Sequence, residues 1–395
     1  MRILFIVSIC LLIFSGCERK VPPSTIAFEV FCEMVANDAK PIALSHPMNQ
    51  NELEENLEQF QVIAEKYGVL LFRESEFPVT SLFPSSVTNG KEVILIYKGL
   101  RLTQYQQFKQ DLPALKKQEA ARRFGRLLGY TPHGINDLLM QNTNFKTLSN
   151  FGVTHQVTHL YYQDIAEAQE FYRSILGLPE VNGSTFRIGE DAWIQLHAFS
   201  EDHPAGQPKS TAIALLTNQL PEWYAYALEN EIPIKYSYKP RAGGPHDGFV
   251  AVDPGGYVLE FEEFKQHAEN ELFMAALHHA PVVNTNVESL AFFGSITWTY
   301  HNDLLKMQRF YEEVLGFRMV ADQGWTKIYQ TSPSGFIGLV DERRGMMDYA
   351  EDKAIELEWR LAQVKEASEY YQSTDYWKTG KGYLLGPENY RYLLR

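Results

Sequence analysis

The sequence predicts an α+β protein in which a small α/β module precedes two consecutive domains built from paired βαβββ modules. Three observations lead to this prediction. One stretch, at residues 158–178, recurs at 297–317 with the same spacing of its aromatic and glycine residues. At the start of each copy the apolar residues follow a helical period. The segments behind that helix read as short strands bounded by turn residues.

The first residues resemble the export signal of a bacterial lipoprotein. Arg2 precedes an apolar run over 3–14, which is too short to span a bilayer as a mature helix. A Ser-Gly pair then leads into Cys17, and small residues directly before a cysteine resemble a lipobox. We therefore expect a signal peptide at 1–16 and a lipidated Cys17 followed by a tether at 17–50. A plain secretory signal or an N-terminal anchor is the alternative.

Such an anchor would hold the protein in the membrane of the bacterial cell envelope, outside the cytoplasm on the periplasmic face. No later segment approaches the roughly 18 consecutive apolar residues of a membrane-spanning helix. With Cys17 acylated, Cys32 would be the only thiol of the mature chain, so no internal disulfide is expected.

The charge balance argues against nucleic acid as a partner. The chain has 36 basic and 49 acidic residues, which gives a formal net charge of −13. No basic excess is available to neutralise phosphates, so we expect no nucleic-acid binding.

Residues 51–148 predict the small α/β module. Apolar stripes and short apolar runs, punctuated by glycine and proline, define its elements. The expected elements are a helix at 51–66 ended by Gly68, strands at 69–72 and 93–97, and helices within 103–128 separated at Pro113. No chemical motif accompanies them.

The repeat divides the remaining chain into domains at 150–266 and 290–395, joined by a linker at 267–289. Asp164 and Asp303 lie 139 residues apart, each where a carboxylate can cap the start of a helix. The further elements expected in the first copy are strands at 193–199, 211–216, 248–252 and 257–264, and a helix at 221–230.

These signals together resemble a known family. A strand, a helix-starting aspartate, Phe171-Tyr172, Leu176-Gly177 and the later DPGGYVLE at Asp253 resemble the vicinal oxygen chelate superfamily. Its members include glyoxalase I, extradiol dioxygenases and bleomycin-resistance proteins. The resemblance implies paired βαβββ modules whose open side holds a divalent metal, which is chelated by two neighbouring oxygens of a substrate.

The resemblance also implies positions for the metal ligands, and the first copy keeps one of them. The implied positions are Val157, Gln195, a residue near Thr211, and Glu260. His159 and His197 share the strand face of the first two, because alternate residues of a strand point the same way. A shifted site of His159, His197 and Glu260, with Gln195 as a weak ligand, would suit one Fe, Mn, Zn or Ni ion. The alternative is that these histidines line a polar cavity without metal.

The second copy has lost its ligands, and no metal is expected there. Its corresponding positions are Ile296, Gly338, a residue near Glu356, and Leu393. Trp298 and Tyr300 face that cavity instead, and aromatic walls suit an apolar ligand or a packing partner.

Two classes of function stay open beside a purely structural scaffold. The missing ligands favour a membrane-anchored binding module that holds a small molecule or a protein partner without catalysis, as a monomer or a homodimer. The resemblance and Glu260 favour a metal-dependent lyase or isomerase, or an extradiol-type dioxygenase, that uses the first copy. Tyr161 and His246 are then the candidates for acid or base.

Overall fold

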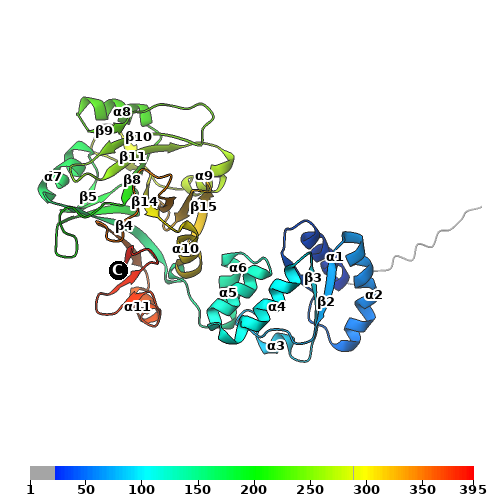
Figure 1. Ribbon diagram of the computed structural model, residues 1–395. Coiled ribbons are helices and arrows are strands. Elements are labelled where there is room, and N and C mark those ends of the chain that lie inside the picture. The colour runs from blue at the N-terminus through cyan, green and yellow to red at the C-terminus, as the bar shows by residue number, and fades with distance from the viewer. Residues whose placement is uncertain (1–22, 288) are drawn as a thin grey trace, which may run out of the picture. The chain divides into compact units, whose positions relative to one another are not determined.

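The structure is a computed structural model that describes residues 23–287 and 289–395, and the chain divides into two compact units, Met1–Thr143 and Asn144–Arg395 (Figure 1). The predicted signal peptide and lipidated Cys17 lie outside the described residues. Within the described part, no helix has both the length and the apolar character needed to cross a membrane.

The first unit is a three-stranded antiparallel sheet covered by helices. The strand order is β1-β3-β2, and α1 and α2 lie on one side of the sheet (Figure 1). Its elements are α1 (Pro23–Ala36), β1 (Ile42–Leu44), α2 (Gln50–Tyr67), β2 (Leu70–Glu74), α3 (Ser85–Thr88), β3 (Val93–Tyr97), α4 (Arg101–Asp111), η1 (Leu112–Ala114), α5 (Lys117–Leu127) and α6 (Pro132–Asn142).

Local signals in the sequence explain the predicted helix α2. The Asn49 side chain accepts a hydrogen bond from the backbone N–H of Glu52, which caps the start of the helix. Gly68 ends the helix in the left-handed conformation, at φ 65°. Pro113 falls in η1 between α4 and α5, so the predicted break is confirmed.

The interpretation of residues 17–50 as a tether needs correction from residue 23 onward. Helix α1 packs into the core of the first unit, where Phe28 stacks on Phe60 at 3.8 Å between ring centroids. Cys32 lies in the same core, fully buried, and burial raises the pKa of its thiol to about 12. The four prolines of this segment suggested a linker, but the apolar face of α1 makes it part of the fold.

The second unit contains four βαβββ modules in chain order. Module 1 is β4 (Val153–Tyr162), α7 (Ile165–Glu170), η3 (Phe171–Ile175), β5 (Glu180–Asn182), β6 (Thr185–Arg187) and β7 (Ala192–Ala198); module 2 is β8 (Thr211–Leu216), α8 (Leu220–Glu229), β9 (Ile234–Tyr236), β10 (His246–Val252) and β11 (Val258–Phe264). Module 3 is β14 (Gly294–His301), α10 (Leu304–Arg309), η5 (Phe310–Leu315), β15 (Arg318–Asp322), β16 (Thr326–Gln330) and β17 (Gly335–Asp341); module 4 is β18 (Ile355–Leu361), α11 (Val364–Tyr371), β19 (Trp377–Lys378), β20 (Tyr383–Leu385) and β21 (Arg391–Leu394). The remaining elements are η2 (Leu148–Phe151), η4 (Ala268–Asn270), α9 (Glu271–Leu277), β12 (Val283–Asn284) and β13 (Ala291–Phe292).

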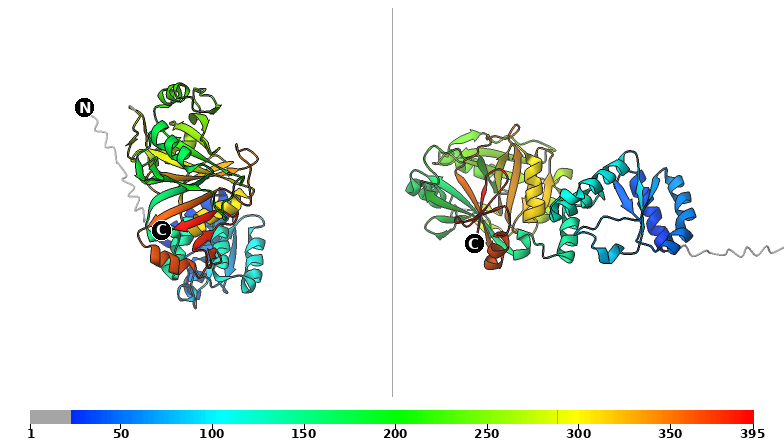
Figure 2. Two further views of the ribbon diagram at one scale, coloured as in Figure 1. Left: turned by 90° about the vertical axis from the view of Figure 1, so that its left-hand side faces the viewer. Right: turned by 60° about the horizontal axis from the view of Figure 1, so that its bottom comes forward.

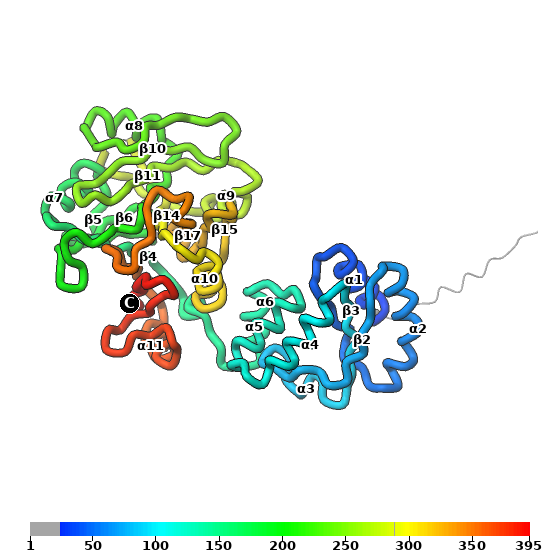
Figure 3. The backbone as a smooth tube through the Cα atoms, in the orientation of Figure 1, coloured from blue at the N-terminus to red at the C-terminus, as the bar shows by residue number. Residues whose placement is uncertain are grey.

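These modules form two eight-stranded sheets, which confirms the predicted fold class. The first sheet has the order β19-β20-β21-β18-β4-β7-β6-β5 and joins module 4 to module 1. The second has the order β15-β16-β17-β14-β8-β11-β10-β9 and joins module 3 to module 2. The domains predicted at 150–266 and 290–395 therefore interleave, since each contributes one module to each sheet. β4 and β18 run antiparallel side by side although they are far apart in sequence. Figure 3 traces the backbone of the chain through β4 and on to α11.

The two sheets face one another, so each has an inner and an outer face. Thr158 on β4 and Thr297 on β14 are joined by a hydrogen bond of 2.6 Å between their hydroxyls, which defines the inner faces. Their strand neighbours His159 and Trp298 therefore point outward, on opposite sides of the pair. Figure 2 shows the second unit from two further directions.

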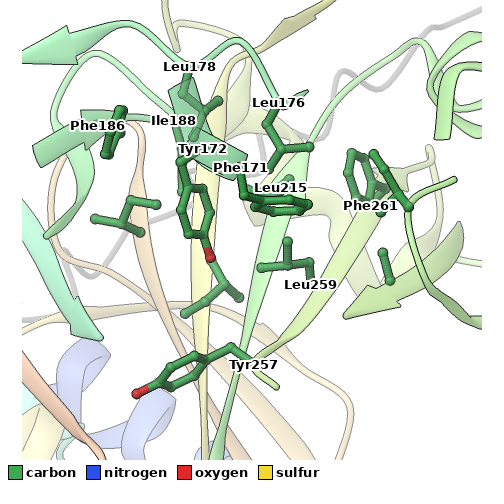
Figure 4. Packing of buried hydrophobic residues seen from close by; sticks show 14 of the residues in the cluster. Phe171, Tyr172, Leu176, Leu178, Phe186, Ile188, Leu215, Tyr257, Leu259 and Phe261 are labelled. Atoms are coloured by element: carbon green, nitrogen blue, oxygen red, sulfur yellow. The ribbon is translucent and has the colours of Figure 1, made fainter. Parts of the chain in front are cut away.

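Apolar side chains fill the space between the sheets around the helices (Figure 4). The motif residues belong to this core. Asp253 is buried and accepts hydrogen bonds from the hydroxyls of Tyr162 at 2.6 Å and Tyr172 at 2.8 Å, and from the backbone N–H of Tyr257. Through these hydrogen bonds the DPGG turn connects β4 and η3, so the motif has a structural role.

Candidate functional site

The predicted site residues form their densest polar cluster on the outer face of the first sheet. We call this the first outer face and define it by His159, Tyr161, Gln195, His197, Glu356 and Glu358. Strand β4 supplies His159 and Tyr161, two residues apart and therefore on one face. The parallel strand β7 places Gln195 beside His159 and His197 beside Tyr161. The antiparallel strand β18 places Glu356 beside His159.

Three side chains form a hydrogen-bonded series on this face. His159 Nε2 lies 3.2 Å from Oε2 of Glu358, and His159 Nδ1 lies 2.7 Å from Nε2 of His197. The other oxygen of Glu358 accepts a hydrogen bond of 3.1 Å from Arg360. His159 and Glu358 are buried, whereas His197 is half-buried and forms the accessible end of the series.

The hydrogen bonds of the series agree with a neutral His197 that keeps one lone pair. Burial and the neighbouring His159 lower the pKa of His197 to about 4, so its ring is neutral at neutral pH. Where His159 donates from Nε2 to Glu358 and accepts at Nδ1, His197 donates from Nε2 and keeps a lone pair on its own Nδ1. This nitrogen can accept a proton or a hydrogen bond.

A second cluster surrounds Glu356. Tyr161 donates to its Oε2 at 2.9 Å, while His203 Nε2 and Arg391 Nη1 each lie 3.3 Å from Oε1. Burial alone would raise the pKa of Glu356, but the hydrogen bonds from His203 and Tyr161 hold it at about 2. Burial and the Glu356 charge raise the pKa of Tyr161 far above its usual range, so its hydroxyl acts here as a donor.

The structure does not bring Glu260 and His246 together with His159. Glu260 lies on β11 and pairs with Ala214, which pairs with Ile296 on the outer face of the second sheet. His246 lines a pocket on that same face together with Glu260. The predicted metal site of His159, His197 and Glu260 is therefore wrong, because the modules that carry them pair with different partners.

The residues on the first outer face do not fit a resident metal. The two ring nitrogens of His159 point at different partners, so His197 and Glu358 cannot share one ion with the same nitrogen at about 2.0–2.2 Å. Val157 and Leu393, at two implied ligand positions, are apolar. In the described residues, no group of three or more His, Cys, Asp or Glu side chains could hold a metal ion.

Several residues of the site escaped sequence reasoning. Glu358, Arg360 and Arg391 come from the fourth module and reach the first module only through the interleaved pairing. His203 comes from the loop before β8, which gave no periodic signal. The alternation Glu356-Leu357-Glu358-Trp359-Arg360 is a signal that could have revealed a strand with one charged face.

Comparison with known proteins agrees with this fold. Residues 153–261 match the Glyoxalase/Bleomycin resistance protein/Dioxygenase superfamily. The predicted resemblance to the vicinal oxygen chelate superfamily is thus confirmed for this segment of the chain. No curated protein matches the chain.

The solved structures that match the chain share little sequence with it. A candidate dioxygenase from Bacillus subtilis is 17% identical, with a TM-score of 0.41, over 63% of this chain and 85% of that one. Glyoxalase I from Zea mays is 14% identical, with a TM-score of 0.38, over 61% and 91%. Lactoylglutathione lyase from Agrobacterium tumefaciens is 23% identical, with a TM-score of 0.23, over 28% and 96%.

Proposed function

We propose that the protein is a lipid-anchored protein of the bacterial cell envelope that binds a polar small molecule on its first outer face. The observation that carries this proposal is the series Glu358–His159–His197. It presents one neutral imidazole nitrogen at its half-buried end. A ligand with a hydroxyl or amide donor would satisfy that nitrogen.

The surroundings support binding of a neutral or anionic polar molecule. Arg360 and Arg391 stand at either side of the series, and both are already partly neutralised by Glu358 and Glu356. A fixed set of donors and acceptors of this kind costs little reorganisation when a ligand binds.

The metal-dependent lyase, isomerase or dioxygenase hypothesis has less support. It needs several ligands around one ion, and both outer faces lack a complete set. Acid–base chemistry by His197 on a bound ligand is compatible with the binding proposal, since its Nδ1 can take up a proton.

A ligand screen by thermal shift tests the binding proposal. Small hydroxylated molecules, such as vicinal diols and hydroxy acids, are added to the full chain. We expect at least one to raise the melting temperature of the wild type, and the increase to disappear in His197→Ala. Exposed Glu369→Gln on α11 is the matched control and should retain the increase. A stabilising ligand whose effect survives in His197→Ala would contradict the proposal.

Cell fractionation tests the anchor separately. We expect the wild type in the membrane fraction and carrying a fatty acid label. Cys17→Ser should remove the label and release the protein. A membrane-bound, unlabelled wild type would indicate another kind of attachment.

A further inference from the structure

A small pocket on the second outer face is built differently from the first. The face is defined by Ala212, Ala214, Glu260, Glu262, Trp298 and Tyr300. The pocket has a volume of about 100 Å³. Its lining includes Glu260, Glu262, Trp298, Tyr300, Trp325 and Arg344. Its position is equivalent to that of the histidine series, since Trp298 lies 139 residues after His159.

Small residues stand beside two of the lining side chains. Glu260 pairs with Ala214 on β8, and Trp298 pairs with Ala212 on the same strand. Trp298 also lies directly over Gly338, where the indole carbons leave no room for a Cβ atom. The indole is thereby fixed in place as one wall of the pocket.

Two polar groups in this pocket lack partners. The Nε1–H of Trp298 and Oε2 of Glu262 are both buried, and neither has a hydrogen-bond partner among the residues that the structure describes. The side chains are 7% and 6% exposed. An unpaired buried polar group costs about 1–3 kcal/mol. Both therefore favour a ligand that offers an acceptor to the indole and a donor to the carboxylate.

Glu260 and Glu262 form a buried acidic pair. Burial raises the pKa of both carboxyl groups, and the negative charge of Glu260 raises that of Glu262 further. A hydrogen bond links the two groups, so they can share one proton. Within the described part of the chain, neither forms an ion pair. Arg344 lines the same pocket but lies over the Trp325 ring, 5.0 Å from its centroid.

We propose that this pocket binds a small organic amine that also carries a hydrogen-bond acceptor. The ammonium group lies at Glu260 and Glu262, and the acceptor receives the Nε1–H of Trp298. Aromatic walls at Trp298, Tyr300 and Trp325 suit a cation, because the ring faces are electrostatically negative. A cavity of about 150 Å³ holds benzene, so this one suits a ligand of about four to five heavy atoms.

The site is independent of the proposed function on the first outer face. The two clusters lie on opposite sides of the paired sheets and use different residues. Loss of ligand binding at His197 would therefore leave amine binding unchanged, and the two proposals can fail separately.

Calorimetric titration of the full chain with ethanolammonium tests this inference. Ethanolammonium offers an ammonium group and a hydroxyl acceptor, while propylammonium lacks the acceptor and neutral propanol lacks the charge. We expect saturable binding at one site per chain in the order ethanolammonium, propylammonium, propanol. Glu262→Gln should weaken both amines by about tenfold or more, because an uncharged amide replaces the carboxylate partner. Glu263→Gln, on the opposite face of β11, is the matched control and should bind as the wild type does.

Trp298→Phe distinguishes the two contacts. This variant keeps an aromatic wall but removes the indole N–H, so ethanolammonium should lose its advantage over propylammonium. Melting temperatures of the variants show whether each one folds, and either variant alone tests the inference. No binding of any amine, equal binding of propanol, undiminished binding in Glu262→Gln, or displacement of the amine by Ca²⁺ would overturn it.

Discussion

At the scale of single residues, His197 determines whether the first outer face can accept a hydrogen bond. Its ring is held against His159, in surroundings that disfavour the charged form. The lone pair on Nδ1 exists only while the ring stays neutral. Whether this face can accept a hydrogen bond from a ligand therefore depends on the ionisation of His197.

The first prediction concerns that ionisation. The pKa of His197 falls from 6.5 to about 4 on folding, so the unfolded chain binds more protons between these values. His197 should therefore contribute stability above pH 6.5, and this contribution should be lost as the pH falls toward 4. Nitrogen NMR of the histidine side chains measures the titration directly. A His197 ring that titrates near 6.5 would show that burial does not control it.

Glu356 gives a second prediction, at lower pH. Its pKa falls from 4.5 to about 2, so its stabilising contribution should be present above pH 4.5 and be lost as the pH falls toward 2. Glu356→Gln should cost about 2 kcal/mol of unfolding free energy at neutral pH, because Arg391 and His203 lose their charged partner. Denaturant unfolding measures this cost. The exposed Glu369→Gln should change it by less than about 0.5 kcal/mol. Equal effects of the two substitutions would contradict the role of Glu356.

At the scale of elements, the DPGG turn connects strand, helix and sheet through one carboxylate. Asp253 joins Tyr162 of β4 to Tyr172 of η3. The equivalent turn of the second copy has Gly386 at this place, and there the hydroxyls of Tyr311 and Tyr392 lie 3.2 Å apart. In the second copy the carboxylate of Glu388, two residues further along the turn, contacts His301 and accepts a hydrogen bond from the backbone N–H of Asp303 instead.

Replacement of that carboxylate is the third prediction. Asp253→Ala removes the acceptor of the Tyr172 hydroxyl and of the Tyr257 N–H and leaves Tyr162 only its contact of 3.3 Å with the Tyr172 hydroxyl, so it should destabilise the second unit by about 3 kcal/mol. Thermal unfolding followed by circular dichroism measures the loss. Asp202→Ala removes an aspartate whose side chain is 64% exposed and should cost less than about 0.5 kcal/mol. A stable Asp253→Ala variant would mean that the motif is not structural.

Most elements could be predicted because their signals are local. The helix at 51–66, the strand at 211–216 and the capping by Asp164 all follow from spacing over a few residues. Helix α1 was missed because nearby prolines outweighed its apolar face. Among the site residues, His159, Tyr161, Gln195 and His197 were correctly placed on one face. Their partners Glu356 and Glu358 lie about two hundred residues away.

At the scale of the whole molecule, the pairing of modules is the feature that sequence could not determine. Strand β4 has β18 as its neighbour, and β8 has β14. Each of these four strands begins a similar module, and the apolar pattern of each strand allows any of the others as a partner. Long-range pairing follows from packing of the complete unit, which a local pattern does not encode.

The fourth prediction follows from this interleaving. A fragment of residues 144–266 lacks both β18 and β14, so it should expose the edges of β4 and β8 and fail to fold. The fragment 144–395 should fold and unfold in one cooperative transition. Calorimetry and circular dichroism measure both. A folded, monomeric 144–266 fragment would show that the first sequence domain is self-sufficient.

Nitrogen NMR of the histidines during addition of Zn²⁺ to the full chain distinguishes a hydrogen-bonded site from a metal site. On the first outer face, hydrogen bonds and not a resident metal hold the histidines of the binding site. We predict that equimolar Zn²⁺ leaves the signals of His159 and His197 unchanged at neutral pH. A stoichiometric shift of both rings, abolished in His159→Ala, would contradict the claim and restore a metal-dependent function.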